Sequence, residues 1–189
     1  MTRALLVVDV QVDFCEDGSL PVAGGRQVAE GVRALLDGDH GYDVVVASED
    51  WHVDPGDHFS DAPDFAATWP AHCRVGTDGA RLQEPLTEDL FDAVVRKGEH
   101  AAAYSAFEGE TPDGGAGDRS LTDLLRDRGV DALDVCGVAT DHCVRASVLD
   151  ACAAGFDVRV LLPLCAGVAP ATTAAALEQM RTAGAVVVP

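Results

Sequence analysis

Three residues of types that support nucleophilic catalysis stand where apolar, strand-length runs end. Asp9 ends the run LLVVD, Lys97 follows AVVR, and Cys143 follows CGVATDH at the start of a predicted helix. The positive end of a helix dipole and a neighbouring ammonium both favour a reactive thiolate. A carboxylate beside them can accept and return a proton. The three residues therefore predict a nucleophile, its cationic activator and a proton shuttle; the alternatives are a buried structural cysteine and a turn-capping aspartate.

The lysine in this set is unusual within the chain. Lys97 is the single lysine, whereas the chain has twelve arginines. A site that keeps lysine can need a compact ammonium with an adjustable pKa, which a planar guanidinium does not supply. Chance is the competing explanation for this one fact.

A second group of residues is typical of a metal site. Asp50 and His52 form an Asp-x-His pair, and His58 and His72 follow within 23 positions. Imidazole and carboxylate ligands suit zinc, iron or manganese. An Asp-x-His spacing in an extended segment directs both side chains to the same face. We interpret His40, His100 and Cys73 as bystanders.

The elements that must position these residues alternate between apolar runs of strand length and amphipathic helical segments, as in a parallel sheet covered on both faces. The predicted strands are residues 4–10, 43–47, 92–96, 132–138, 158–162 and 185–188. The predicted helices are residues 28–36, 121–128, 141–154 and 172–183. This order predicts one α/β domain over residues 1–189, with a doubly wound, mostly parallel six-stranded sheet in a Rossmann-like αβα sandwich.

In such sheets ligands bind beyond the carboxyl ends of the strands, which is where the residues above fall. Residues 48–85 form a long irregular segment rich in Asp, Pro, Gly, His and Trp, and a loop of that length is usually functional. The Gly-rich acidic segment 109–118 has no lysine and follows no strand directly, so it is not a phosphate loop, and it receives no role.

Composition excludes several classes of function. The net charge of −19 argues against nucleic acids and anionic membranes as partners. No apolar run approaches the ~18 residues that a membrane helix requires. The first apolar run is interrupted by Asp9 and Asp13 and lacks a cleavage pattern, so we expect a cytoplasmic protein. None of the six cysteines forms a CxxC pair, and neither common nucleotide-binding glycine motif occurs.

Taken together, the motifs resemble the nicotinamidase/pyrazinamidase family of the isochorismatase-like cysteine hydrolases. The resemblance covers nearly the whole chain, and it is specific because several motifs are present in the order and at the spacing that the family shows. The matching stretches are LLVVDVQVDFC, GSLPVAGG, DWHVDPGDHFS, WPAHC, KGEHAAAYSAFEG, CGVATDHCVRAS and AGVAPATTAAALEQM.

The resemblance implies a role for each matching residue. It implies a catalytic triad of Asp9, Lys97 and Cys143, and an oxyanion hole from the backbone amides of Ala139 and Cys143 after a cis Val138–Ala139 peptide. It implies one divalent metal ion, zinc, iron or manganese, and no organic cofactor. The implied metal ligands are Asp50, His52, His58 and His72. The implied substrate-binding residues are Phe14 and Trp69, which would sandwich an aromatic ring, with Leu20, Tyr104 and Val138 nearby.

The implied reaction is metal-dependent hydrolysis of nicotinamide, and of pyrazinamide, to the acid and ammonia through a Cys143 thioester. The implied partner is the small-molecule substrate, and the implied task is recycling nicotinamide for NAD synthesis; the chain would be a monomer or homo-oligomer.

Three alternatives remain open from the residues. A metal-bound water could attack with Cys143 passive. A related cysteine amidase could act on another small amide or carbamoyl group. A non-enzymatic metal-binding or redox-sensing module would need thiol ligands or a resolving cysteine, for which Cys15 and Cys73 are the candidates.

Overall fold

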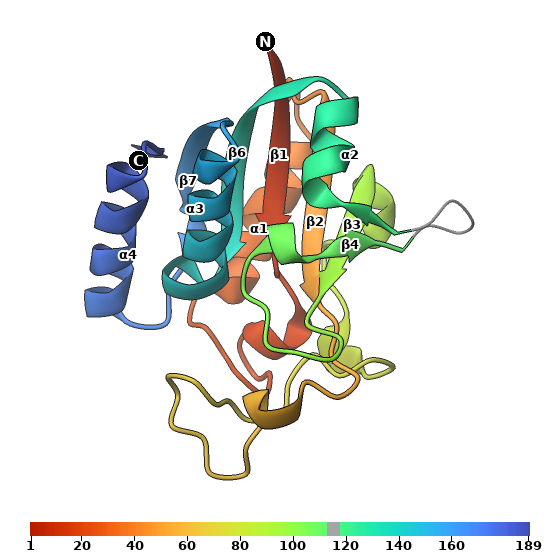
Figure 1. Ribbon diagram of the computed structural model, residues 1–189, viewed down its shortest axis with the longest axis vertical. Helices are drawn as coiled ribbons and strands as arrows, with labels where there is room; N and C mark the ends of the chain where they lie inside the picture. Colours follow the sequence, from red (N-terminus) through yellow and green to blue (C-terminus); the bar gives the residue numbers. More distant parts are fainter. Residues whose placement is uncertain (113–117) are drawn as a thin grey trace.

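One eight-stranded sheet runs through the part of the chain that the computed structural model describes, residues 1–112 and 118–189 (Figure 1). Its order is β5-β4-β3-β2-β1-β6-β7-β8. The strands are β1 Thr2–Val8, β2 Val44–Asp50, β3 Ala93–Lys97, β4 Glu110–Thr111, β5 Arg119–Ser120, β6 Val130–Val138, β7 Asp157–Ala166 and β8 Val186–Val188. All six predicted strands are present and pair in parallel, so the α/β prediction is confirmed.

The sheet has two strands more than the six that the sequence predicts. β4 and β5 pair in antiparallel fashion at the edge of the sheet next to β3. Each has two residues, which is too short to show an alternation of apolar and polar side chains. The segment 109–118 therefore contributes a strand to the sheet edge, while its residues 113–117 lie outside the described residues.

Helices cover both faces of the sheet because successive residues of a strand point to opposite faces. Leu6 and Val8 of β1 belong to a core cluster with residues of α2, α3 and α4, whereas Leu5 and Val7 belong to a second cluster with α1. In Figure 1 α2 and α3 lie in front of the sheet and α1 behind it. The helices are α1 Gly25–Leu36, α2 Leu121–Asp127, α3 Arg145–Ala153 and α4 Pro170–Thr182.

The predicted helix 141–154 begins differently from expectation. Its first turn, Thr140–Val144, is a π-helix, and α3 starts only at Arg145. A π-helical turn is wider than an α-helical one and occurs often at functional sites. Cys143 lies inside this turn, directly after the carboxyl end of β6.

The long segment between β2 and β3 covers the carboxyl ends of the strands and then returns to the start of β3 (Figure 1). It contains only short 3₁₀ helices, which agrees with the irregular loop predicted for residues 48–85. Within the described residues, no helix has the length and apolar character to cross a membrane.

Gly137 permits β6 and β1 to approach each other at the level of the site. Its φ is +124°, and a Cβ there would lie 2.1 Å from the Val8 carbonyl oxygen. We expect Gly137→Ala to lower the free energy of unfolding by more than about 2 kcal/mol, because the backbone of a central strand would have to move. Urea unfolding measures the change.

Gly41→Ala is the matched control for this substitution. Gly41 also has a positive φ, +67°, but a Cβ there meets nothing within 4 Å. It should cost only the roughly 1–2 kcal/mol of a left-handed backbone. Equal losses for both variants would show that the close approach of β1 and β6 is unimportant.

Candidate active site

The structure brings Asp9, Lys97 and Cys143 together at the carboxyl ends of three strands. β1 lies between β2 and β6, and β3 is next to β2, so the strand ends that carry them converge. The Lys97 Nζ lies 2.8 Å from Asp9 Oδ2 and 3.8 Å from Cys143 Sγ. All three side chains are buried. A nucleophile, a cation and a carboxylate are thus in mutual contact.

Backbone and side-chain contacts fix Asp9 in this position. Its φ is 49°, a left-handed conformation that costs a non-glycine residue on the order of 1–3 kcal/mol. Ser48 compensates by donating from its Oγ to Asp9 Oδ1 at 2.7 Å, and the Asp9 N–H donates to the Ser48 carbonyl at 3.1 Å. The turn directs the carboxylate toward Lys97 instead of continuing the strand.

The pKa shifts of the three triad residues indicate that Cys143 is not a preformed thiolate. Burial raises the pKa of Cys143 well above its usual value, and Lys97 opposes that shift without cancelling it. Burial also raises the pKa of Asp9, again against the effect of Lys97. Burial lowers the pKa of Lys97, but Asp50 and Asp9 more than offset this, so Lys97 stays protonated. The resting nucleophile is therefore a neutral thiol, whose proton must move as it attacks.

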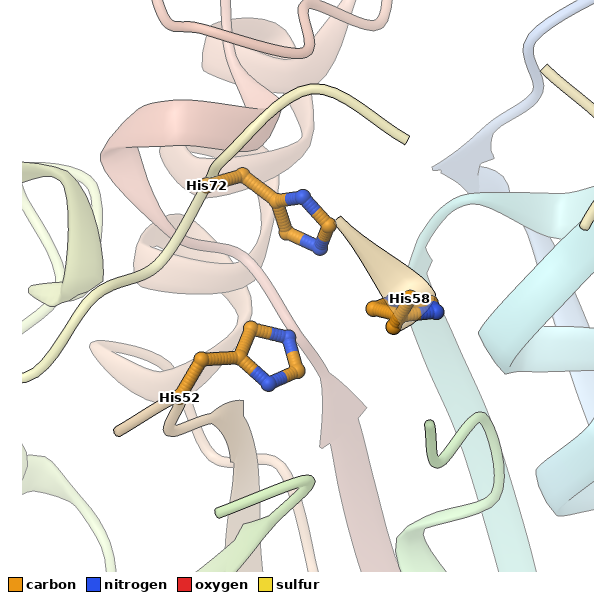
Figure 2. Close-up of side chains that lie close together, drawn as sticks. All are labelled: His52, His58 and His72. Atoms are coloured by element: carbon orange, nitrogen blue, oxygen red, sulfur yellow. The ribbon is translucent and has the colours of Figure 1, made fainter. Parts of the chain in front are cut away.

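His52, His58 and His72 form a second cluster beside the triad, and their rings face a common point (Figure 2). One nitrogen from each ring lies within 4.8 Å of the others. The His52 Nδ1 contacts the Gly98 carbonyl at 2.6 Å, and the His72 Nδ1 contacts the Pro70 carbonyl at 2.8 Å. Such contacts hold the proton on Nδ1 and leave Nε2 as a metal ligand.

Two observations show that this cluster fits a divalent cation. Within the described residues, His52 Nε2 and His58 Nδ1 are buried and have no hydrogen-bond partner. Buried nitrogens without partners are costly, and a bound cation would satisfy them. Burial, followed by the charges of His72 and His52, lowers the pKa of His58 to about 4, so its ring is neutral near pH 7 and able to bind a metal.

Asp50 connects the two clusters. Its Oδ2 lies 3.5 Å from His52 Nε2 and 3.6 Å from His72 Nε2, while its Oδ1 pairs with Lys97. Gln11 holds the Asp50 backbone, donating to its carbonyl at 2.9 Å and accepting from its N–H at 2.8 Å. Sequence reasoning missed Gln11, although a polar residue directly after an apolar strand was the available signal.

Of the predicted bystanders, His40 and His100 lie outside the histidine cluster, whereas Cys73 adjoins it and its carbonyl accepts the His52 N–H at 3.1 Å. His40 stacks on Tyr42, and the exposed His100 lies 3.6 Å from Glu99. All six cysteines are free, so Cys15 and Cys73 form no disulfide.

We expect His72→Ala to lose most of its bound metal, because removal of one of three clustered imidazoles leaves too few ligands to hold a cation tightly. His100→Ala is the matched control, an exposed histidine outside the cluster. Metal content after dialysis, measured by atomic emission, checks this. A stoichiometric metal content in His72→Ala would contradict the ligand set.

A cavity of about 600 Å³ is lined by Cys143 of the triad and by His58, His72 and Asp50 of the metal cluster. Phe14, Leu20, Trp69 and Tyr104 line it, as predicted, and the Trp69 Nε1 donates to the Tyr104 hydroxyl at 3.0 Å. Ala139 and Cys143 also line it, and the Val138–Ala139 peptide is cis, as expected. Further lining residues that sequence reasoning missed include Ala66, Ala103, His142, Val168 and Thr172.

Val138 does not line this cavity. It is fully buried and packs in the core cluster that includes α1. Val138 is next to Ala139 in the sequence, but it is the last residue of β6. Side chains of a strand point alternately to its two faces, and this one points into the core.

A doubly wound sheet with a triad and a histidine cluster at its strand ends is typical of the isochorismatase-like hydrolases. The chain belongs to the isochorismatase family, whose domain model matches residues 3–189. It is 50% identical to the nicotinamidase/pyrazinamidase of Mycobacterium tuberculosis, over 96% of this chain and 95% of that protein.

Two solved structures agree with this relationship. The pyrazinamidase of Pyrococcus horikoshii in complex with zinc is 35% identical, with a TM-score of 0.78 over 100% of this chain and 99% of that one. PnC1 from L. infantum in complex with nicotinate is 34% identical, with a TM-score of 0.83 over 99% and 92% of the two chains. The resemblance to nicotinamidases is therefore confirmed.

Proposed function

We propose that this chain, acting as a single hydrolase domain over residues 1–189, converts nicotinamide to nicotinate and ammonia, and pyrazinamide to pyrazinoate. The observation that carries the proposal is the contact of Lys97 with both Asp9 and Cys143, because Cys143 also lines a cavity with aromatic walls. The nicotinamidase relatives support the choice of amide. Free cysteines throughout the chain support a reducing, cytoplasmic location.

The first half of the reaction forms a thioester. The Cys143 Sγ attacks the carboxamide carbon while its proton passes to Asp9, whose raised pKa makes it a better proton acceptor than an exposed carboxylate. The N–H groups of Ala139 and Cys143 stabilise the developing oxyanion, and the loss of one such donor typically costs about 10²–10³-fold in rate. Asp9 then gives the proton to the leaving nitrogen, and ammonia departs.

The second half releases the acid. Asp9 takes a proton from water, whose oxygen attacks the thioester carbon. The C–S bond then breaks, Asp9 returns that proton to the Cys143 sulfur to restore the thiol, and the acid gives its remaining proton to solvent as it leaves as a carboxylate. Lys97 remains charged throughout, because Asp50 and Asp9 hold its pKa high. Its ammonium stabilises the negative charge when that charge is on Asp9 and when it is on the Cys143 sulfur.

The three clustered histidines and Asp50 would hold a divalent ion, for which zinc, iron and manganese are all suitable. When bound, the ion supplies a positive charge that orients a ring nitrogen of the substrate. Phe14 and Trp69 confine a flat ring from the apolar walls, which favours a heteroaromatic amide over an aliphatic one.

Ammonia release from nicotinamide, pyrazinamide and benzamide tests the function. Benzamide has the same carboxamide and a ring of the same size but no ring nitrogen. We expect turnover of nicotinamide in the common range of about 1–10³ s⁻¹ and much weaker turnover of benzamide. No ammonia from nicotinamide or pyrazinamide by the metal-loaded protein would overturn the proposal in favour of another amide.

A further inference from the structure

A second cavity, of about 370 Å³, adjoins the substrate cavity. It lies between the π-helical turn, the start of α3 and one face of α4. Four residues line both cavities: Ala66, Tyr104, His142 and Thr172. The Tyr104 and His142 rings stack with centroids 6.4 Å apart, and they provide a flat aromatic wall at the junction.

The cation in this second cavity, Arg145, has no acidic partner among residues 1–112 and 118–189. Nine of the twelve arginines form ion pairs, as expected in a chain with 32 acidic residues. Within the described residues Arg74, Arg126 and Arg145 form none, and of these only Arg145 is partly buried. Its Nη1 donates to Gln179 Oε1 at 3.0 Å, while its Nε is buried without a partner.

The carboxylate that lines the same cavity, Asp141, is engaged elsewhere. It accepts hydrogen bonds from the N–H groups of Val168, at 2.9 Å, and Ala169, at 3.3 Å, and from the Thr172 hydroxyl. The other titratable group there, His142, has a pKa lowered by burial and by Arg145, so it adds no positive charge near pH 7. The guanidinium is thus left to bind an anion from outside the chain.

We propose that this second cavity binds the aromatic carboxylate product as it leaves the substrate cavity, with Arg145 as its counter-ion and the wall of Tyr104 and His142 against its ring. The inference rests on the proposed function, because that reaction converts a neutral amide into an anion. The substrate has no charge for Arg145 to recognise, whereas a carboxylate matches the guanidinium fork.

A separate product site has a kinetic signature. Nicotinate would bind to enzyme that already holds amide, so its inhibition of nicotinamide turnover would be mixed instead of purely competitive. We expect Arg145→Gln to raise the inhibition constant of the noncompetitive component at least about ten-fold, the usual scale for loss of a charge-assisted hydrogen bond. Arg126→Gln, which removes another arginine without an ion pair, should leave it unchanged.

A second pair of variants tests the cavity without touching Arg145. Ala175 is exposed and lines the cavity, whereas Ala174 is exposed on the same helix and does not. Ala175→Glu places a carboxylate within reach of Arg145 and should abolish the noncompetitive component, and Ala174→Glu should retain it. Both variants add the same charge to α4, so a difference between them reports occupancy of the cavity.

Equilibrium dialysis with labelled nicotinate separates this inference from the proposed function, because it needs no turnover. Wild type and Ala174→Glu should bind a second equivalent of acid that Arg145→Gln and Ala175→Glu lack. Purely competitive inhibition in wild type, or a second equivalent retained in Arg145→Gln, would overturn the product site. Failure of the ammonia assay with a second equivalent still present would overturn only the amidase.

Discussion

Cys143→Ala is expected to lower ammonia release from nicotinamide by about 10⁴–10⁶-fold, the range found when a nucleophile that acts as part of a unit is removed. The thiol is the atom that would bond to the substrate, and Lys97 Nζ lies 3.8 Å from it. Neither Asp9 nor water in the pocket can form the same acyl intermediate. Initial-rate ammonia assays on metal-loaded protein measure the loss.

Cys152→Ala is the matched control, since Cys152 is a partly buried cysteine of α3 that packs against the core outside the cavity. It should retain near-normal turnover. Metal content should be equal in wild type and Cys143→Ala, because the clustered ligands are histidines. Equal activity of Cys143→Ala and wild type would instead identify a metal-bound water as the nucleophile and remove Cys143 from the mechanism.

Lys97→Met is expected to abolish activity and to lower the free energy of unfolding at pH 7 by about 3–5 kcal/mol, the usual cost of removing one partner of a buried ion pair. The substitution nearly preserves volume but leaves Asp9 and Asp50 buried without their cation. Urea unfolding at pH 7 and pH 5 measures the effect.

The pH dependence of this loss has a definite sign. Lys97 lowers the pKa of both Asp9 and Asp50, so its removal raises both carboxyl pKa values in the folded state relative to wild type. A raised carboxyl pKa favours the folded state as pH falls, because the buried groups then become neutral. The stability difference between wild type and Lys97→Met should therefore shrink from pH 7 to pH 5.

Lys97→Arg separates charge from geometry. It retains a cation and should recover part of the stability, yet lose at least about 10²-fold in activity because the guanidinium fork displaces the packed carboxylate and thiol. Arg126→Met, at an exposed arginine without an ion pair, should change stability by no more than about 0.5 kcal/mol. Normal turnover in Lys97→Arg would refute the requirement for a compact ammonium.

The sequence predicted the sheet well because buried parallel strands appear as continuous runs of β-branched residues. Predicted strand ends were less accurate where a residue adopts a backbone conformation that the pattern of apolar residues does not indicate. Residues 4–10 were predicted as the first strand, yet β1 ends at Val8, since Asp9 turns into a left-handed conformation that hydropathy does not register. β7 continues to Ala166 through Pro163, a residue that usually ends a strand.

Much of the site could also be predicted, because parallel strands end at one edge of the sheet and chemically distinctive residues stand at several of those ends. The electrostatic balance could not. A helix start and an ammonium predicted a thiolate, but burial, with the charges of Asp9 and Asp50, raises the pKa of Cys143 against the effect of Lys97 and leaves a thiol. The side-chain direction of Val138 and the engagement of Asp141, which leaves Arg145 without a partner, depend on three-dimensional packing that spacing does not encode.

The burial of the one lysine gives this chain an internal reporter of its own opening. An amine-directed reagent cannot reach Lys97 in the closed molecule, where only 2% of the residue is exposed. Acylation at that position therefore requires the elements around the end of β3 to separate locally or the whole chain to unfold. Peptide mass mapping of Lys97 over time would read the frequency of those openings directly, without an introduced label. Ligands that bind at the strand ends stabilise the folded site, so they should slow the acylation of Lys97 more as their affinity rises.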